Sequence, residues 1–378
     1  MSKIKCEICG ADTHAIEVHI KRDHPEVTLD EYVAKYPDAP LLSEMAKQKL
    51  KEQQELKERT AKAARPVTET AHDKKPMHEV FGLGKVAGAM NAAGQPYLVS
   101  VTTSEYEDMV PDLDLDYVFE LEGLKNVLMA IEMNIPAYVW GHAGTGKTTL
   151  IEQVAARTKR PLLRVQHTVN TEEAHVVGQW TARAGETIFE LGPLALAMKH
   201  GWIYLADEYD FALPAVLAVY QPVLEGKSLV IKEADSLNRI IRPHPNFRFI
   251  ATGNTNGSGD ETSLYQGTSI QNAANYDRFH MVLEMKYMEP ELEKQVLINQ
   301  AKIDKGDAER FVEFANRVRE QFSGSKISSP ISPRTLIAAA TIGYIKGNFR
   351  TGLALAWANK LPRMDREVVD GLAQRIFG

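Results

Sequence analysis

The residues from 141 to 149 have the types and the spacing of a phosphate-binding loop. In the pattern G-x-x-x-x-G-K-[ST], glycines let backbone N–H groups close around phosphates, the lysine reaches the β- and γ-phosphates, and the last hydroxyl reaches Mg²⁺. An apolar run at 137–140 precedes the loop and a helix-forming run follows it, as the chemistry requires. The alternative is a glycine-rich turn with a chance lysine. We predict that ATP is bound by Gly141, His142, Ala143, Gly144, Thr145, Gly146, Lys147, Thr148 and Thr149, with Thr148 as a magnesium ligand.

A second apolar run, 202–206, ends in two acidic residues, Asp207 and Glu208. An acid at the carboxyl end of a strand beside a phosphate loop can hold Mg²⁺, and its neighbour can orient and deprotonate a water molecule. We therefore predict Asp207 as a magnesium and nucleotide residue and Glu208 as the catalytic base of ATP hydrolysis. The alternative is an ordinary strand that ends in a solvated acidic turn.

Composition limits the class of protein. The 378 residues leave room for two or three domains, and a net charge of −6 gives no general attraction to nucleic acid or to an anionic membrane. Two cysteines do not make a disulfide framework. No apolar stretch follows the basic start, and no apolar run approaches the length of a membrane span. We expect a cytoplasmic protein without a membrane segment.

Four segments differ along the chain. Residues 1–40 hold both cysteines, and residues 41–75 form a charged helical linker. Residues 76–285 alternate strand-like and helix-like runs, which indicates a parallel α/β sheet. Residues 286–378 favour helices, at 290–303, 307–322, 333–345 and 364–377. The predicted fold class is α/β, a P-loop parallel sheet domain with a C-terminal helical lid and a small N-terminal zinc-finger-like domain.

From about residue 112 onward the chain resembles the AAA+ ATPases of the MoxR branch, and within it the CobS subunits of cobaltochelatase. Specific strings in the family's order carry this resemblance. Besides the phosphate loop and the acidic pair with Tyr209 and Asp210, they are Val110-Pro111-Asp112, Ala251-Thr252-Gly253-Asn254-Thr255, Leu264-Tyr265-Gln266-Gly267-Thr268, Asp277-Arg278-Phe279 and Ser332-Pro333-Arg334.

The resemblance implies three further catalytic residues. Asn254 matches the neutral donor that positions the water against the γ-phosphate, and Asn256 is a nearby competitor. Arg278 matches the arginine that reaches the neighbouring subunit's γ-phosphate, with an ion pair to Asp277 as the alternative. Arg334 matches the arginine with which the lid touches the nucleotide, with a solvated first-turn residue as the alternative.

The resemblance also implies partners. They are a homo-oligomeric ring, expected to be a hexamer, and a partner protein with a von Willebrand A-like domain. Two expected hairpins, at 176–191 and 228–241, fit insertions that point at the ring pore or the client in this branch; decorative surface hairpins are the alternative. The function predicted is an ATP-driven motor that remodels a partner protein, with metal chelation as one form of that work.

The N-terminal segment departs from the CobS pattern. Cys6, Cys9, His19 and His24 have the spacing of four ligands to tetrahedral Zn²⁺, and the segment resembles the bacterial Ros/MucR finger. The alternatives are His14 as a substitute for one of these ligands, and free thiols with surface histidines that bind no metal. Residues 1–75 are roughly balanced in charge, whereas a DNA reader normally shows a basic face. We therefore favour protein docking by the finger over a nucleic-acid-associated motor recruited through it.

Overall fold

The computed structural model describes residues 3–48, 51, 72–84, 87–90, 93–183 and 185–378. The chain divides into two compact units, Met1–Thr68 and Glu69–Gly378. Residues 44–48 and 51 of the predicted charged linker are helical, and most of the linker lies outside the described residues. In the described parts of the chain, no helix combines the length and the apolar character that a membrane span needs.

The N-terminal unit is a small ββα fold with an added helix. Strands β1 (Ile4–Lys5) and β2 (Asp12–Thr13) pair antiparallel, and helices α1 (Ile16–Asp23) and α2 (Leu29–Lys35) follow. Among its described residues, four apolar side chains form the buried core: Cys6, Ile16, Ile20 and Tyr32. A core of this size provides little stability by itself, so the unit is a candidate for stabilisation by a metal.

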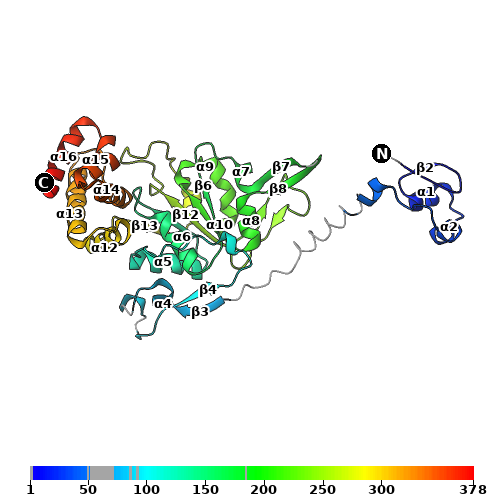
Figure 1. Cartoon of the computed structure of the whole chain (residues 1–378), viewed down its shortest axis with the longest axis horizontal. Coiled ribbons are helices and arrows are strands. Elements are labelled where there is room, and N and C mark those ends of the chain that lie inside the picture. Colours follow the sequence, from blue (N-terminus) through cyan, green and yellow to red (C-terminus); the bar gives the residue numbers. More distant parts are fainter. Residues whose placement is uncertain (1–2, 49–50, 52–71, 85–86, 91–92, 184) are drawn as a thin grey trace. The chain divides into compact units, whose positions relative to one another are not determined.

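The larger unit is built on a five-stranded parallel sheet (Figure 1). Its strand order is β13-β5-β12-β9-β6, and every pair in it is parallel. The strands are β5 (Ala137–Trp140), β6 (Leu162–Gln166), β9 (Ile203–Asp207), β12 (Arg248–Gly253) and β13 (Met281–Glu284). The three central strands β5, β12 and β9 are almost fully buried and mostly apolar, because their side chains alternate between two faces that are both covered.

Each face of the sheet packs against its own helices. Ile203, Leu205 and Ile250 face a core that includes α5 (Leu121–Glu132) and α6 (Lys147–Arg157). Tyr204 and Phe249 face the opposite core, which includes α8 (Pro193–His200). The remaining helices of this region are α4 (Met77–Phe81), α7 (Glu173–Val177), α9 (Pro214–Leu217), α10 (Gln221–Leu224), α11 (Ala273–Tyr276) and the 3₁₀ turns Ala87–Ala89, Glu107–Met109, Tyr209–Phe211 and Ala218–Tyr220.

Three antiparallel strand pairs decorate the sheet domain. Strand β7 (Gly178–Arg183) pairs with β8 (Glu186–Leu191), and β10 (Leu229–Val230) pairs with β11 (Ile240–Ile241), so both predicted hairpins are confirmed. The indole N–H of Trp180 donates to the Glu233 carbonyl at 2.8 Å and links the two insertions. The third pair, β3 (His72–Pro76) with β4 (Leu98–Thr102), was not predicted.

The C-terminal part is helical, and its first helix begins where the last strand of the sheet has ended (Figure 1). Helices α12 (Pro290–Ala301), α13 (Lys305–Ser323), α14 (Pro333–Lys346) and α16 (Arg363–Phe377) confirm the four predicted helices within a few residues. The prediction missed α15 (Phe349–Ala356) and the 3₁₀ turn Ala358–Lys360. Helix α15 has only eight residues and contains Gly352, so its periodicity gives a weak signal.

We expect Gly352→Ala to destabilise the lid. A Cβ at this position would lie 2.2 Å from the Ala339 carbonyl oxygen, a backbone atom of α14 that cannot move without disturbing the helix pair. Overpacking of this kind costs about 1–3 kcal/mol. Thermal or denaturant unfolding measures the loss. Gly371→Ala in α16 is the control, because a Cβ there meets nothing within 4 Å and should raise helix stability by about 0.5–1 kcal/mol. Equal stability of the two variants would contradict the packing described.

Candidate nucleotide and metal sites

Three adjacent strands deliver the predicted nucleotide residues to one edge of the sheet. Strand β12 lies between β5 and β9, parallel to both. The phosphate loop follows β5, Glu208 follows β9 and Asn254 follows β12. Because the carboxyl ends of parallel strands meet at one edge, three segments that are far apart in sequence converge there.

The backbone of the phosphate loop needs its glycines. Gly144 and Gly146 have φ values of 77° and 91°, which other residues adopt at a cost. At Gly141, with φ of 151°, a Cβ would lie 2.1 Å from the Met285 carbonyl oxygen. The loop leads into α6 at Lys147, so the helix N-terminus with its free N–H groups faces the loop. The local geometry therefore fits an anionic phosphate group.

Lys147 is a buried cation with neutral partners. Its ammonium donates to the carbonyls of Gly141 at 2.7 Å and His142 at 3.1 Å, and to Asn254 Oδ1 at 3.2 Å. Burial lowers the pKa of Lys147 to about 8, although the carboxylates of Asp210, Asp207 and Glu208 act in the opposite direction. A positive charge held by neutral oxygens is well suited to receive phosphate oxygens. Of the two candidate asparagines, Asn254 contacts Lys147, whereas the side chain of Asn256 accepts from Ser258 N at 3.0 Å.

Asp207 is held as a carboxylate beside the Thr148 hydroxyl. Thr148 donates to its Oδ1 at 2.8 Å, Thr252 donates to the same oxygen, and Arg164 Nη2 lies 2.6 Å from Oδ2. Burial alone would raise the pKa of Asp207, but the hydrogen bonds from Thr252 and Thr148 and the charge of Arg164 together lower it. A hydroxyl beside a carboxylate is a fitting donor pair for Mg²⁺ and its water shell.

Glu208 stands in a strained backbone position at the end of β9. Its φ is 52° and its ψ is 42°, the left-handed region that is uncommon outside glycine. Gln166 on β6 donates to Glu208 Oε2 at 2.8 Å, and the Glu208 N–H donates to Thr252 Oγ1 at 3.3 Å. Backbone strain of this kind is concentrated at functional sites. The Glu208 carboxylate also acts on the pKa of Lys147, so it belongs to the same edge of the sheet.

Reasoning from the sequence missed Asp210, a positioning residue of this edge. Its buried Oδ2 accepts from Asn254 N at 2.8 Å, Thr255 N at 2.9 Å and Thr255 Oγ1 at 2.9 Å. Burial raises the pKa of Asp210 in spite of these bonds. Asp210 thus fixes the backbone from which Asn254 reaches Lys147. Its place in the string after Glu208 was the only sequence signal for it.

The two predicted arginines lie in different surroundings. Arg334 is in the first turn of α14, and a Cβ on Gly144 would lie 2.7 Å from Ser332 Oγ and 3.6 Å from Arg334 Cβ. The lid therefore touches the phosphate loop. Arg278 donates from Nε to Glu225 Oε1 at 2.7 Å and from Nη1 to the Ala274 carbonyl. The alternative of an ion pair with Asp277 was wrong in its partner, because Glu225 on the surface takes that role.

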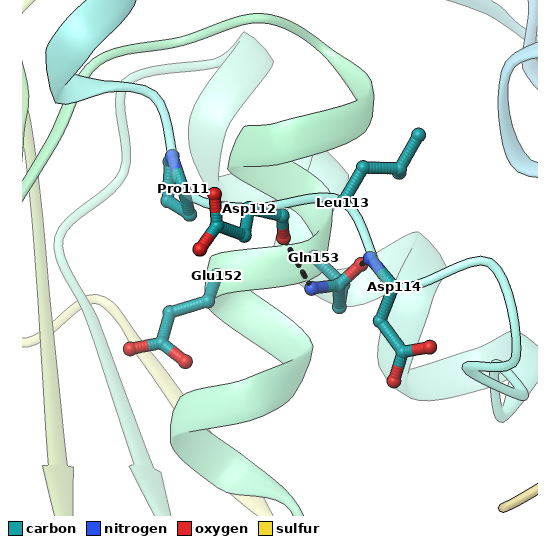
Figure 2. Close-up of a pocket in the computed structure, with 6 residues that line it drawn as sticks. All are labelled: Pro111, Asp112, Leu113, Asp114, Glu152 and Gln153. Atoms are coloured by element: carbon teal, nitrogen blue, oxygen red, sulfur yellow. Dashed lines mark hydrogen bonds between the residues drawn. The ribbon is translucent and has the colours of Figure 1, made fainter.

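A cavity of about 400 Å³ beside α6 does not belong to the nucleotide site (Figure 2). Segment 111–114 crosses the helix there, and the Gln153 amide donates to the Asp112 carbonyl at 2.9 Å. Three carboxylic acids, Asp112, Asp114 and Glu152, are among its lining residues. A phosphate would be repelled by this lining. None of the predicted nucleotide residues lines the cavity.

The N-terminal unit brings together the four predicted zinc ligands. One ligand atom from each of Cys6, Cys9, His19 and His24 lies within 4.8 Å of the others. His24 Nε2 is buried and has no hydrogen-bond partner among the described residues, as expected of an atom that faces a metal. His19 Nδ1 lies 2.7 Å from Asp23, which leaves Nε2 toward Cys9 Sγ at 3.2 Å. His14 bonds to Ser43 at 3.0 Å instead and lies outside the cluster.

Comparison with known proteins agrees with this geometry. Residues 137–279 match the AAA domain of the dynein-related subfamily, and residues 293–373 match the CbbQ/NirQ/NorQ C-terminal domain. The aerobic cobaltochelatase subunit CobS of a Sinorhizobium species is 36% identical over 284 residues, which cover 73% of this chain and 85% of CobS. Protein NorQ of Paracoccus denitrificans is 26% identical, over 65% of this chain and 87% of NorQ. CbbQ of Hydrogenophilus thermoluteolus is 25% identical, over 55% of this chain and 74% of CbbQ.

The fold and the site define an ATPase of the AAA+ type, which uses ATP and Mg²⁺. The chain belongs to the MoxR-like AAA+ ATPases, the family that includes CobS, NorQ and CbbQ. The family resemblance inferred from the motifs is confirmed at this level.

We expect Glu208→Gln to bind ATP but to hydrolyse it at least about 100-fold more slowly, since the attacking water loses its base while the phosphate loop is intact. Lys147→Ala should instead weaken ATP binding itself, because the ammonium that faces the loop is lost. Phosphate release and equilibrium nucleotide binding, measured for both variants, separate the two effects. Near-normal ATP turnover by Glu208→Gln would show that Glu208 is not the catalytic base.

Proposed function

We propose that this protein is a ring-forming ATPase that uses hydrolysis to remodel a partner protein. The observation that carries the proposal is the convergence of Lys147, the Thr148–Asp207 pair, Glu208 and Asn254 at one sheet edge. A binding protein needs only the phosphate loop. Glu208 is a carboxylate that can act as a base, and Asn254 is a neutral hydrogen-bond donor. Their presence in addition to the phosphate loop favours ATP hydrolysis over binding alone.

Each residue of the site has a task in hydrolysis. Lys147 and the loop amides bind the β- and γ-phosphates, and Thr148 with Asp207 would hold Mg²⁺, which neutralises charge on the phosphates when bound. Glu208 takes a proton from the attacking water, and Asn254 orients that water. Arg334, at the start of the lid helix that touches Gly144, contacts the nucleotide from the lid, so that lid position depends on nucleotide state.

Arg278 acts in trans in this proposal. Its hydrogen bonds go to Glu225 and Ala274 rather than to the phosphate loop of its own subunit. The Arg278 side chain is 27% exposed, and its Glu225 partner 33%. A pair this accessible contributes little to the stability of the fold, so little is lost when Arg278 leaves Glu225 for a neighbour's γ-phosphate. A site completed by a neighbouring subunit requires a head-to-tail assembly, which we propose to be a closed hexameric ring.

The similarity to CobS suggests which partner and which activity the ATPase serves. We propose a partner protein with a von Willebrand A-like domain, and metal chelation as one form of the remodelling, by analogy with the cobaltochelatase subunit. The two linked hairpins, which expose Trp180, Val230 and Ile240, are the proposed contact surface for the client.

The N-terminal unit is proposed to be a zinc finger for protein docking. The orphan Nε2 of His24 and the Asp23-oriented ring of His19 support a metal bound by both Nε2 atoms and both sulfurs. Residues 3–48 hold six Lys or Arg against nine Asp or Glu, and this acidic balance disfavours duplex DNA. The competing function is a nucleic-acid-associated motor recruited through the finger.

Arg278→Ala subunits should bind nucleotide yet turn over at least about 100-fold more slowly, because an arginine supplied in trans contributes a large factor to hydrolysis. Mixing them with Lys147→Ala subunits should restore part of the activity, since a mixed interface joins an intact nucleotide site to an intact Arg278. Phosphate release as a function of mixing ratio measures the rescue. A protein that stays monomeric in ATP and Mg²⁺ at working concentration would overturn the ring.

The purified protein should carry about one zinc per chain, measured by elemental analysis. Cys9→Ser should lose the metal, whereas His14→Ala should keep it, because His14 bonds to Ser43 outside the cluster. ATP hydrolysis should survive metal removal, since the finger and the ATPase are separate compact units. A zinc content near zero in protein prepared without chelator would contradict the proposal that the N-terminal unit is a zinc finger. A salt-sensitive affinity for duplex DNA that vanishes with the zinc would favour the motor instead.

A further inference from the structure

The loop between Asn254 and α11 reaches the phosphate loop through one side chain. The Tyr265 hydroxyl lies 3.0 Å from Ala143 N and 2.9 Å from His142 Nδ1. Burial raises the pKa of Tyr265 and lowers that of His142, so at neutral pH the phenol keeps its proton and the imidazole is uncharged. The phenol oxygen therefore accepts from the Ala143 N–H, and its O–H donates to His142 Nδ1 when the imidazole carries its proton on Nε2. These two bonds link the motif 264–268, which has no role in the site so far, to the nucleotide loop.

Both ends of one peptide group are held at this point. The N–H of the His142–Ala143 peptide donates to Tyr265, and its carbonyl, that of His142, accepts from Lys147 Nζ at 3.1 Å. The same carbonyl accepts from Thr145 Oγ1 at 2.8 Å. A rotation of this peptide would break the Tyr265 bond and remove one of the three oxygens that hold the ammonium of Lys147.

The backbone of Tyr265 is itself anchored by its own turn. Asp260 Oδ2 accepts from Tyr265 N at 2.7 Å, while Asp260 Oδ1 accepts from Thr262 N and Thr262 Oγ1, both at 2.9 Å. Thr268 Oγ1 donates to the Tyr265 carbonyl at 3.0 Å. The loop that carries Tyr265 is thus held by its own hydrogen bonds, and the peptide that it contacts is held by bonds within the phosphate loop.

We propose that Tyr265 is a positioning residue of the ATPase, which fixes the His142–Ala143 peptide and through it the ammonium of Lys147 for the phosphates of ATP. The proposal rests on the assignment of Lys147 to the nucleotide site. Lys147 meets the phosphates in the ground state and in the transition state alike, so its orientation contributes to binding in both. Loss of the Tyr265 hydroxyl should therefore raise KM and leave kcat nearly unchanged.

The test is steady-state ATP hydrolysis by Tyr265→Phe, which keeps the ring and removes only the hydroxyl. Two lost hydrogen bonds, one of them to a half-buried imidazole, should raise the KM for ATP about 5- to 10-fold with kcat within about twofold. Tyr344→Phe is the matched control, because that phenol is 64% exposed on α14 and should change neither constant. An unchanged KM for Tyr265→Phe, or a loss confined to kcat, would overturn the proposal.

A second variant separates positioning from general folding. Asp260→Ala removes the acceptor that holds Tyr265 and should raise KM by a similar factor, with an unchanged melting temperature of the ATPase unit. The double variant Asp260→Ala/Tyr265→Phe should be no worse than the more affected single variant, because both act through the same hydroxyl. Fully additive effects would contradict a shared route. Lys147→Ala distinguishes the two possible failures. If Lys147→Ala still binds ATP normally, the assignment of Lys147 to the nucleotide site is wrong. If Lys147→Ala loses ATP binding while Tyr265→Phe leaves KM unchanged, only the proposed role of Tyr265 is wrong.

Discussion

The parallel pairing of β12 between β5 and β9 is the constraint on which the site depends. It sets Gly253 opposite Trp140, and Ala251 opposite Ala206, so the three strands end together. A shift of one residue in this register would move every buried side chain to the other face of the sheet. The apolar runs that pack against α6 and α8 therefore also set the distances between the phosphate loop, Asp207 and Asn254. The same strand register therefore determines both the packing of the core and the geometry of the site.

Buried charge is the second requirement, and neutral or hydrogen-bonded partners meet it. Lys147 is compensated by carbonyl and amide oxygens, Asp207 by two hydroxyls and Arg164, and Asp210 by the backbone that carries Asn254. The ammonium of Lys147 and the carboxylate of Asp207 are therefore compensated without a direct bond between them. Lys147 is free to bind a phosphate, and Asp207 is free to bind a cation. A salt bridge between them would close the site.

The sequence was sufficient for the parts with strong local signals. The phosphate loop, the acid pair after an apolar strand and the helices with Pro290 and Pro333 at their starts all depend on neighbours in sequence, and the structure has them within a few residues. The order of strands and the roles of Asp210, Gln166 and Tyr265 depend on contacts across more than thirty residues. Spacing carries no information on such contacts, so the sequence could not place them. His14 shows the same limit, since only the fold reveals that Ser43 is its partner.

The central claim is that this sheet edge hydrolyses ATP with a divalent cation held near Thr148 and Asp207. Phosphate release by the purified wild-type protein, with ATP in the presence of Mg²⁺ and again with excess chelator, tests it most directly. We expect steady phosphate release with Mg²⁺ and release near background without it. Release that is equal in both conditions, or ATP binding with no release in Mg²⁺ by the assembled protein, would contradict it.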